Sequence, residues 1–365
     1  MPPSRAEPEH EPDRNTQPRP EPRPLELWTP MVAIPGHVAS IAKRAEAAGW
    51  YGVTITDSQN LAGDAYVAMS VAASATTTLR VSTGVTNPFT RHPAVAAAAL
   101  WHLQIESAGR AGIGLGRGDS SLAHLGMAPA PVGMLDDYLT KLQAYLRGEA
   151  VPLDWSEVTT LAVAERPAES RLRWLALRAS LEKPPVFVVG SGPKVLRLAA
   201  EKADRVVLAV GADPQRVRWA VDLVRSVRAD VPVGAFVNTV VDDDPERARA
   251  LVAGGVASFA RFSAMHGHAS GPLPDEQRSV IESIPKAYDL ERHFQSAPHS
   301  EGLPPGFVDA FAVVGPPALV VERFCELAEL GIDQFHVVGP TGDVDPGAAR
   351  TARRRFTAEV LPELA

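Results

Sequence analysis

Polar residues follow three apolar segments of the chain, in positions where a ligand could be bound and a proton transferred. They are Asp57 after segment 51–56, Thr86 and Asn87 at the end of segment 79–86, and Asp119 after segment 110–116. An asparagine amide both donates and accepts hydrogen bonds, as the edge of a bound heterocycle requires. A carboxyl such as Asp119 can act as an acid at neutral pH when burial raises its pKa. This pattern indicates a site for a ring-shaped ligand beside a proton donor.

Each of these residues also has a purely structural interpretation. Asp57 and Asp119 can cap the helices that follow them, because aspartate favours helix N-termini. Asn87 precedes Pro88, which pushes it to an extended conformation, and ordinary turn chemistry would account for it equally well. The sequence leaves these alternatives open.

A second candidate site is the turn Gly190-Ser191-Gly192-Pro193-Lys194, which follows an apolar run and opens a helix. Such a turn combines free backbone N–H groups, a helix N-terminus and a lysine, which together favour an anion, most simply a phosphate. The spacing of a P-loop is absent. The alternative is a capped helix with a surface lysine. We refer to these five residues as the 190–194 turn.

Several other chemistries find no support in the sequence. The histidines show neither a His-x-His pair after the first strand nor a His-Glu-x-x-His motif, so we expect no catalytic metal. No Gly-x-Ser-x-Gly elbow indicates a serine hydrolase. The single cysteine, Cys325, lies near Phe324 and Leu327 and is interpreted as a core residue. One cysteine excludes an internal disulfide and fits a reducing cytoplasm.

The elements that position these residues alternate between strands and helices. We expect strands at 25–32, 51–56, 79–86, 110–116, 185–190, 205–210, 231–241 and 333–338, with helices between them. Pro93 is predicted at the first position of the helix that starts after His92. Eight strands in this alternation favour an α/β fold of the (β/α)8 TIM-barrel type, whose ligands bind at the C-terminal strand ends.

Composition sets the remaining limits. The chain has 365 residues and a formal net charge of −7, so we expect no nucleic-acid partner. No apolar run approaches the ~20 residues that span a membrane. Residues 1–24 are rich in proline and are predicted to be a disordered tail. Residues 25–365 are predicted to form one barrel domain with an insertion at about 260–305.

Several motifs together resemble those of the bacterial-luciferase-like oxidoreductases, in particular the branch that uses the deazaflavin coenzyme F-420 and is typified by methylenetetrahydromethanopterin reductase. The order and spacing of these motifs along one barrel are more specific than any single motif. They are Ile55-Thr56-Asp57, Thr83-Gly84-Val85-Thr86-Asn87-Pro88, Thr90-Arg91-His92-Pro93, Gly114-Leu115-Gly116-Arg117-Gly118-Asp119 and the 190–194 turn with the helix after it.

The resemblance implies a flavin-type ring on the second to fourth strands, near Asp57, Thr86 and Asn87. It implies a cis peptide between Gly84 and Val85, against the ring, and it places the cofactor phosphate on the 190–194 turn. It also implies a homodimer formed through helices of the first half of the barrel. The chain departs from the family at Ser58, where several deazaflavin enzymes carry a histidine.

We therefore expect a cytoplasmic oxidoreductase that transfers hydride between coenzyme F-420 and a small organic substrate, with Asp119 as the acid. The first alternative is an FMN-dependent luciferase-like monooxygenase. The second is a non-catalytic flavin-binding barrel.

Overall fold

The computed structural model describes residues 24–155, 165–173, 180–264, 267–341 and 343–365. Within them, eight parallel strands form the barrel in the order β3-β2-β1-β11-β9-β8-β7-β4, and the bridges Val81–Ala111 and Thr86–Leu115 connect the last strand to the first. The prediction of a (β/α)8 barrel is thereby confirmed, strand for strand. The barrel strands are β1 (Glu26–Met31), β2 (Gly52–Ile55), β3 (Arg80–Thr83), β4 (Ile113–Leu115), β7 (Val186–Gly190), β8 (Arg205–Leu208), β9 (Val233–Val241) and β11 (Gln334–Val338).

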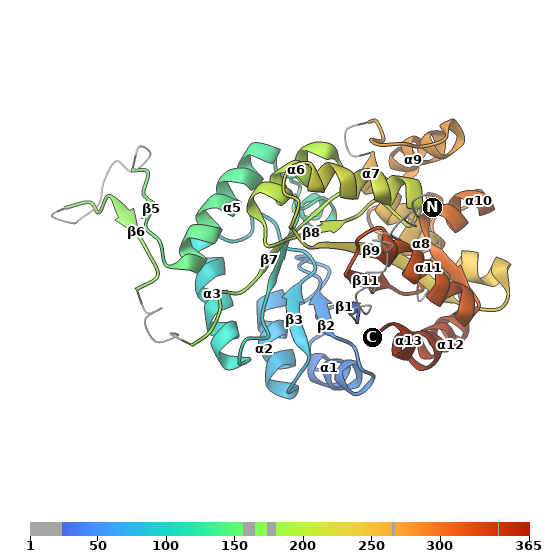
Figure 1. Ribbon diagram of the computed structural model, residues 1–365, viewed down its shortest axis with the longest axis horizontal. Coiled ribbons are helices and arrows are strands. Elements are labelled where there is room, and N and C mark those ends of the chain that lie inside the picture. Colours follow the sequence, from blue (N-terminus) through green and yellow to red (C-terminus); the bar gives the residue numbers. More distant parts are fainter. Residues whose placement is uncertain (1–23, 156–164, 174–179, 265–266, 342) are drawn as a thin grey trace, which may run out of the picture.

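Helices surround this barrel (Figure 1). Many of them begin with proline, whose missing N–H costs nothing at the first helical position. His92 caps α3 by accepting the N–H of Ala94, and Pro93 follows at the predicted first position. The helices are α1 (Val38–Ala47), α2 (Ala65–Ala75), α3 (Pro93–Glu106), α5 (Val132–Arg147), α6 (Pro193–Lys202), α7 (Pro214–Arg225), α8 (Pro245–Ser263), α11 (Pro317–Glu329) and α12 (Pro346–Arg355).

Short elements occupy the segments between these units. A hairpin of β5 (Val151–Pro152) and β6 (Glu169–Ser170) projects from the barrel beside α5 (Figure 1). Strand β10 pairs with the second half of β9, from Thr239 to Val241. The predicted insertion contains the end of α8 and a further helix, α9. The remaining short elements are α4 (Ser120–Ala123), α9 (Asp275–Ala287), α10 (Pro305–Phe311), β10 (Val313–Gly315), the π-helix η2 (Phe356–Val360) and α13 (Leu361–Leu364).

Aromatic rings fill the interior of the barrel. The ring of His336 stacks on Phe236 at 4.5 Å between centroids and lies 5.6 Å from Phe187, and Phe187 lies 6.4 Å from Trp28. A Cβ added to Gly114 would lie 2.4 Å from the Phe187 ring, so glycine is needed for that ring to fit. The barrel is therefore a packed core, as in other barrels of this type.

Cys325 is exposed, and its interpretation as a core residue was wrong. On α11 the buried stripe consists of Val320, Phe324 and Leu327, which recur at helical spacing. Residue 325 is rotated by about 100° from residue 324 around the helix, and this rotation places the thiol on the solvent side.

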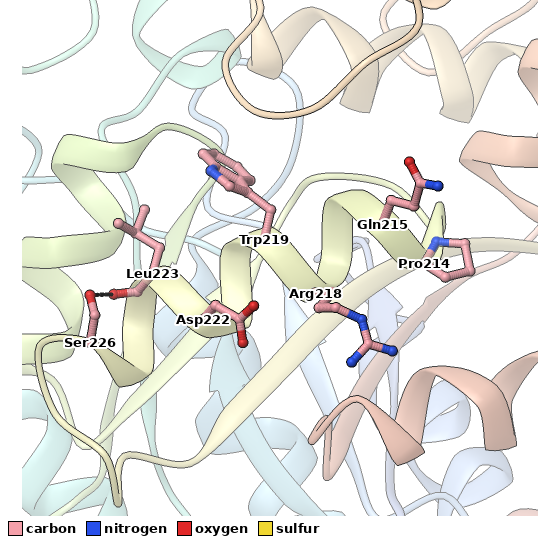
Figure 2. Close-up of a pocket in the computed structure, with 7 residues that line it drawn as sticks. All are labelled: Pro214, Gln215, Arg218, Trp219, Asp222, Leu223 and Ser226. Atoms are coloured by element: carbon pink, nitrogen blue, oxygen red, sulfur yellow. Dashed lines mark hydrogen bonds between the residues drawn. The ribbon is translucent and has the colours of Figure 1, made fainter.

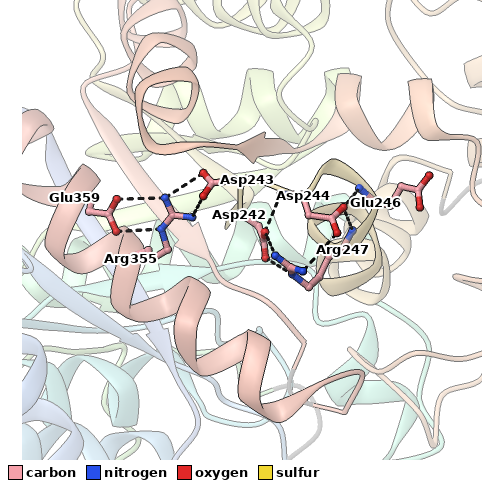
Figure 3. A network of polar contacts seen from close by, with 7 residues as sticks. All are labelled: Asp242, Asp243, Asp244, Glu246, Arg247, Arg355 and Glu359. Carbon is pink, nitrogen blue, oxygen red and sulfur yellow. Dashed lines mark hydrogen bonds and ion pairs between the residues drawn. The ribbon is translucent and has the colours of Figure 1, made fainter.

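A polar network fastens the C-terminal helices to the end of β9 (Figure 3). Asp242 is buried and accepts hydrogen bonds from Arg247, at 2.7 Å from Nε and 2.6 Å from Nη2. Arg355 of α12 pairs with Asp243 at 3.0 Å and with Glu359 at 3.0 Å. Bidentate arginine–carboxylate pairs of this kind fix geometry well. The loop between β9 and α8 is thus held from two sides.

Candidate active site

Asp57 lies in the loop that follows β2 and is almost fully buried. Its Oδ2 accepts a hydrogen bond from the hydroxyl of Thr86 at 2.5 Å, and its Oδ1 accepts one from Gln59 at 2.7 Å. Burial raises the pKa of Asp57, while the Thr86 hydrogen bond opposes the shift. The helix cap is supplied by Asp64, which accepts the N–H groups of Tyr66 and Val67. Asp57 therefore joins the ends of β2 and β3 rather than capping α2.

Asn87 is fully buried, and the two halves of its amide behave differently. Its Oδ1 accepts the backbone N–H groups of Phe89 at 3.0 Å and Thr90 at 3.2 Å, which is the turn chemistry considered from the sequence. Its Nδ2 is buried and has no hydrogen-bond partner among the described residues. A buried donor without a partner costs free energy, so this group fits an acceptor on a bound molecule.

The backbone that follows β3, just before Asn87, is irregular in the way that the resemblance implies. The Gly84–Val85 peptide is cis. A Cβ on Gly84 would lie 2.4 Å from the Cβ of Thr54, and a Cβ on Gly116 would lie 2.9 Å from Val85. The backbone around Gly84 and Val85 is therefore packed so closely that positions 84 and 116 both require glycine.

Asp119 occupies the N-cap position of α4 but makes no capping hydrogen bond. Its carboxylate instead forms an ion pair with Arg261 of α8, which also donates to Ser120 Oγ at 3.0 Å. Burial raises the pKa of Asp119, whereas the positive charges of Arg261 and Arg117 act in the opposite direction. The carboxyl is held in place, and its role as the acid stays a prediction.

The 190–194 turn begins at the end of β7 and opens α6. Gly192 is the N-cap of this helix, and no side chain makes a capping hydrogen bond. Lys194 is exposed. A Cβ built on Gly192 meets no atom within 4 Å, so there is open space beside this residue at the start of α6. Uncapped N–H groups, a nearby lysine and free space suit a phosphate group.

Helix α8 connects these separate parts of the barrel mouth, by which we mean the C-terminal strand ends and the loops that follow them. Arg261 contacts Asp119, and the carbonyl of Phe262 accepts the hydroxyl of Ser191 at 2.9 Å. On the other side of Asp119, a Cβ on Gly118 would lie 2.6 Å from Asn87 Cβ. The predicted residues from β3, β4 and β7 therefore form one continuous region.

Sequence reasoning missed a polar cluster on the α8 side of this region. The ring of Tyr288 lies 4.1 Å from the Arg261 guanidinium carbon, and its hydroxyl contacts Ser258 at 2.8 Å and His293 Nδ1 at 2.5 Å. Burial lowers the pKa of His293 to about 3 and raises that of Tyr288. These residues come from α8 and the insertion, and no local motif marks them in the sequence. We call Asp119, Arg261, Ser258, Tyr288 and His293 the mouth cluster.

Two surface hollows lie elsewhere. One, of about 640 Å³, is an open depression along α7 lined by Trp219 and Leu223 (Figure 2), and the other, of about 380 Å³, lies between the starts of α8 and α11. Neither is lined by a residue of the predicted site. In the described parts of the chain, no group of three or more metal-binding side chains occurs, and no helix is long and apolar enough to cross a membrane.

Comparison with known proteins decides the family. The family model described as luciferase-like monooxygenase matches residues 13–334. The chain belongs to this family. It is an enzyme of the oxidoreductase class, and the fold and motifs identified from the sequence agree with that membership.

Individual relatives agree with the family. The chain is 27% identical over 317 residues to a 5,10-methylenetetrahydromethanopterin reductase from Methanolobus tindarius, covering 84% of this chain and 90% of the relative. It shares its fold with the coenzyme F-420-dependent tetrahydromethanopterin reductase from Methanopyrus kandleri, with a TM-score of 0.66 at 22% identity over 94% of this chain and 100% of that one. The oxygenating part of a Baeyer–Villiger monooxygenase from Pseudomonas putida, in complex with FMN, is also similar in fold, with a TM-score of 0.61 at 16% identity over 94% and 99% of the two chains.

Proposed function

We propose that the protein binds coenzyme F-420 at the barrel mouth and catalyses hydride transfer between this cofactor and a small organic substrate. The observation that carries the proposal is the arrangement held by α8, in which the 190–194 turn, Asp119 and Asn87 lie in one region. The names of the reductase relatives support the choice of the deazaflavin.

The residues of the mouth suit the parts of such a cofactor. Asn87 Nδ2 is a buried donor without a partner, which fits a ring carbonyl. The first N–H groups of α6 and the side chain of Lys194 fit a phosphate. When bound, the deazaflavin supplies a hydride at its C5 position. The protein's contribution is to hold that position against the acceptor carbon, to exclude water and to supply a proton.

The wall on which the ring rests is proposed to consist of Asp57, Thr86, Gly84 and Val85. The hydrogen bond between Thr86 and Asp57 fixes the end of β3 against β2. The hydrogen bonds from Thr86 and Gln59 hold the buried Asp57 carboxyl in one position beside this wall.

The experiment is to incubate the purified protein separately with F-420 and with FMN, remove free cofactor and record the retained absorbance. Retention of F-420 in preference to FMN is the expected result. Retention of FMN alone would replace the proposal by the alternative of a monooxygenase, which the fold shared with an FMN complex keeps open. Retention of neither would refute a cofactor site at the mouth.

We further propose that the protein is a homodimer that acts in the cytoplasm. Apolar side chains on the outer faces of α2 and α3 are exposed, Val67 by 64%, Val95 by 52% and Val71 by 42%. An apolar patch of this kind on two adjacent helices is typical of a subunit interface. The single exposed thiol of Cys325 fits a reducing compartment.

A further inference from the structure

We propose that Arg216, together with Arg278, binds an oxyanion group of the substrate, a carboxylate or a phosphate, so that the protein acts on an organic acid. This inference rests on the proposed function and names the substrate class for the same mouth. Arg216 lies on the first turn of α7, and Arg278 lies on α9 of the insertion.

The guanidinium of Arg216 is buried without a counter-ion. The residue is only 1% exposed, and its Nε and Nη1 have no hydrogen-bond partner among the described residues. Its Nη2 donates to the carbonyl of Ser270 at 3.4 Å, which is long for a hydrogen bond. Burial lowers the pKa of Arg216 to about 10, so the group is charged at neutral pH. A buried charge with so few partners is strongly unfavourable, and an anion would complete it.

Arg110 shows how this chain accommodates an arginine that has a structural role. Its Nε donates to the carbonyl of Ser107 at 2.8 Å, its Nη1 to that of Leu79 at 2.5 Å and its Nη2 to that of Ala73 at 2.9 Å. Every nitrogen of that guanidinium has an acceptor, whereas two of the three nitrogens of Arg216 have none. Hydrogen bonds to the backbone therefore do not account for the burial of Arg216.

The charged groups around Arg216 leave room for an anion. Arg278 adds a second positive charge that acts on Arg216, and its Nη1 donates to the carbonyl of Ala269 at 2.7 Å. Asp213 caps α7 by accepting the backbone N–H of Arg216 at 3.0 Å, and Glu282 accepts the N–H of Ala269 at 3.1 Å. Both carboxylates are thus engaged by backbone groups. A carboxylate or a phosphate matches the planar donors of a guanidinium.

The two arginines lie at the mouth, beside the 190–194 turn. The loop from β8 to α7 begins next to this turn, because the N–H of Ala209 donates to the carbonyl of Gly190 at 2.9 Å. Helix α8 ends at the same turn, and the insertion that follows it meets Arg216 at Ser270. Arg216 is therefore enclosed between a loop of the mouth and the insertion. Since Arg216 and the turn follow neighbouring strands, they can bind two different acidic groups.

The first test compares Arg216→Met with the wild type in urea denaturation, in a buffer without phosphate or carboxylate. Methionine keeps much of the side-chain volume and removes the charge. Because no group of the described chain balances this charge, the free energy of unfolding should stay the same or rise. Arg110→Met leaves several carbonyls without a donor and should be destabilised. A clear loss of stability in Arg216→Met would show that its charge is already balanced within the protein and would overturn the proposal.

The second test measures the melting temperature of the cofactor-free protein with inorganic phosphate and with succinate, against sodium chloride of equal ionic strength. An anion that binds the folded state raises the melting temperature. We expect a rise in the wild type and in Arg218→Met, which changes an exposed arginine of the same helix (Figure 2), and none in Arg216→Met. Gly192→Val should keep the response to succinate. No rise with either anion in the wild type, or an equal rise in Arg216→Met, overturns the proposal.

The third test assigns the oxyanion to the substrate rather than to the cofactor. Levulinate and pentan-2-one share one ketone chain, but only levulinate has a carboxylate. Levulinate should bind the F-420-loaded protein at least about tenfold more tightly, and this preference should disappear in Arg216→Met while the Kd for F-420 stays unchanged. Equal affinities for the two ketones, or weaker F-420 binding in Arg216→Met, would overturn the assignment. The second test needs no F-420, so a failure of the proposed cofactor site is recognised separately.

Discussion

Replacement of Gly192 by valine separates a phosphate site from an ordinary helix start. Gly192 has φ −109° and ψ 154°, an extended conformation that valine adopts readily. A Cβ there meets no atom within 4 Å. The free energy of unfolding without cofactor should therefore change by no more than about 0.5 kcal/mol.

Cofactor binding should respond quite differently to this change. The valine side chain occupies the open space beside residue 192, at the N-terminus of α6 where the phosphate is proposed to bind. Hydrogen bonds to a charged group contribute about 1.5–3 kcal/mol each, so the loss of two weakens binding by at least about 3 kcal/mol. This loss corresponds to an increase in Kd on the order of 100-fold.

The measurement combines a titration of F-420 and of FMN with thermal unfolding of the cofactor-free protein. Gly133→Val is the matched control, because Gly133 lies on α5 and a Cβ built there also meets no atom within 4 Å. Lys194→Ala removes one charge-assisted contact and should raise Kd about tenfold. If Gly192→Val binds both cofactors as tightly as the wild type, no phosphate lies on this turn.

Three further predictions follow from the contacts. Gly118→Ala should lower the free energy of unfolding by about 1–3 kcal/mol in chemical denaturation, because φ is +75° and the new Cβ would lie 2.6 Å from Asn87. Gly126→Ala is the control: φ is +72° there too, but the space is open, so the loss should be smaller. Glu46 accepts the N–H groups of Thr77, Thr78 and Leu79, and these hydrogen bonds lower its pKa to about 2. The stabilisation by the charged form should therefore be present above about pH 4.5 and disappear as the pH falls toward 2. Unfolding curves across this range should show this pH dependence in the wild type and not in Glu46→Gln, which has no charge to lose. Val67→Asp combined with Val95→Asp should convert a dimer to a monomer in analytical ultracentrifugation, and an unchanged mass would contradict the proposed interface.

The barrel was predictable because its signals are local. Most strands are short apolar runs that end in polar or glycine residues, and most of the long helices begin at a proline or a capping side chain. The 190–194 turn was predicted to open a helix, and α6 begins at Pro193 within it. Strand β10 was not predicted, because Val313–Gly315 is too short to show a period, and it pairs only with the far end of β9.

The predicted site residues were found for the same reason, since they lie in the short loops that follow strands. The mouth cluster was not found, because it depends on the path of α8. Arg261 and Asp119 are separated by 142 residues, and nothing near either of them indicates the other. In the sequence the insertion is polar and irregular. In the structure, however, His299 is only 3% exposed and His293 contacts the hydroxyl of Tyr288. Only tertiary packing determines these contacts.

The aromatic rings inside the barrel determine the route by which ligands can enter and leave. Trp28, Phe187, Phe236 and His336 fill the axis, so a molecule that enters at the mouth also leaves there. Of two molecules stacked over the same opening, the one nearer the rings departs last. Turnover is then expected to follow an ordered sequential mechanism, in which the upper molecule is exchanged first. A compound that occupies the upper position before the lower one is filled should inhibit at high concentration.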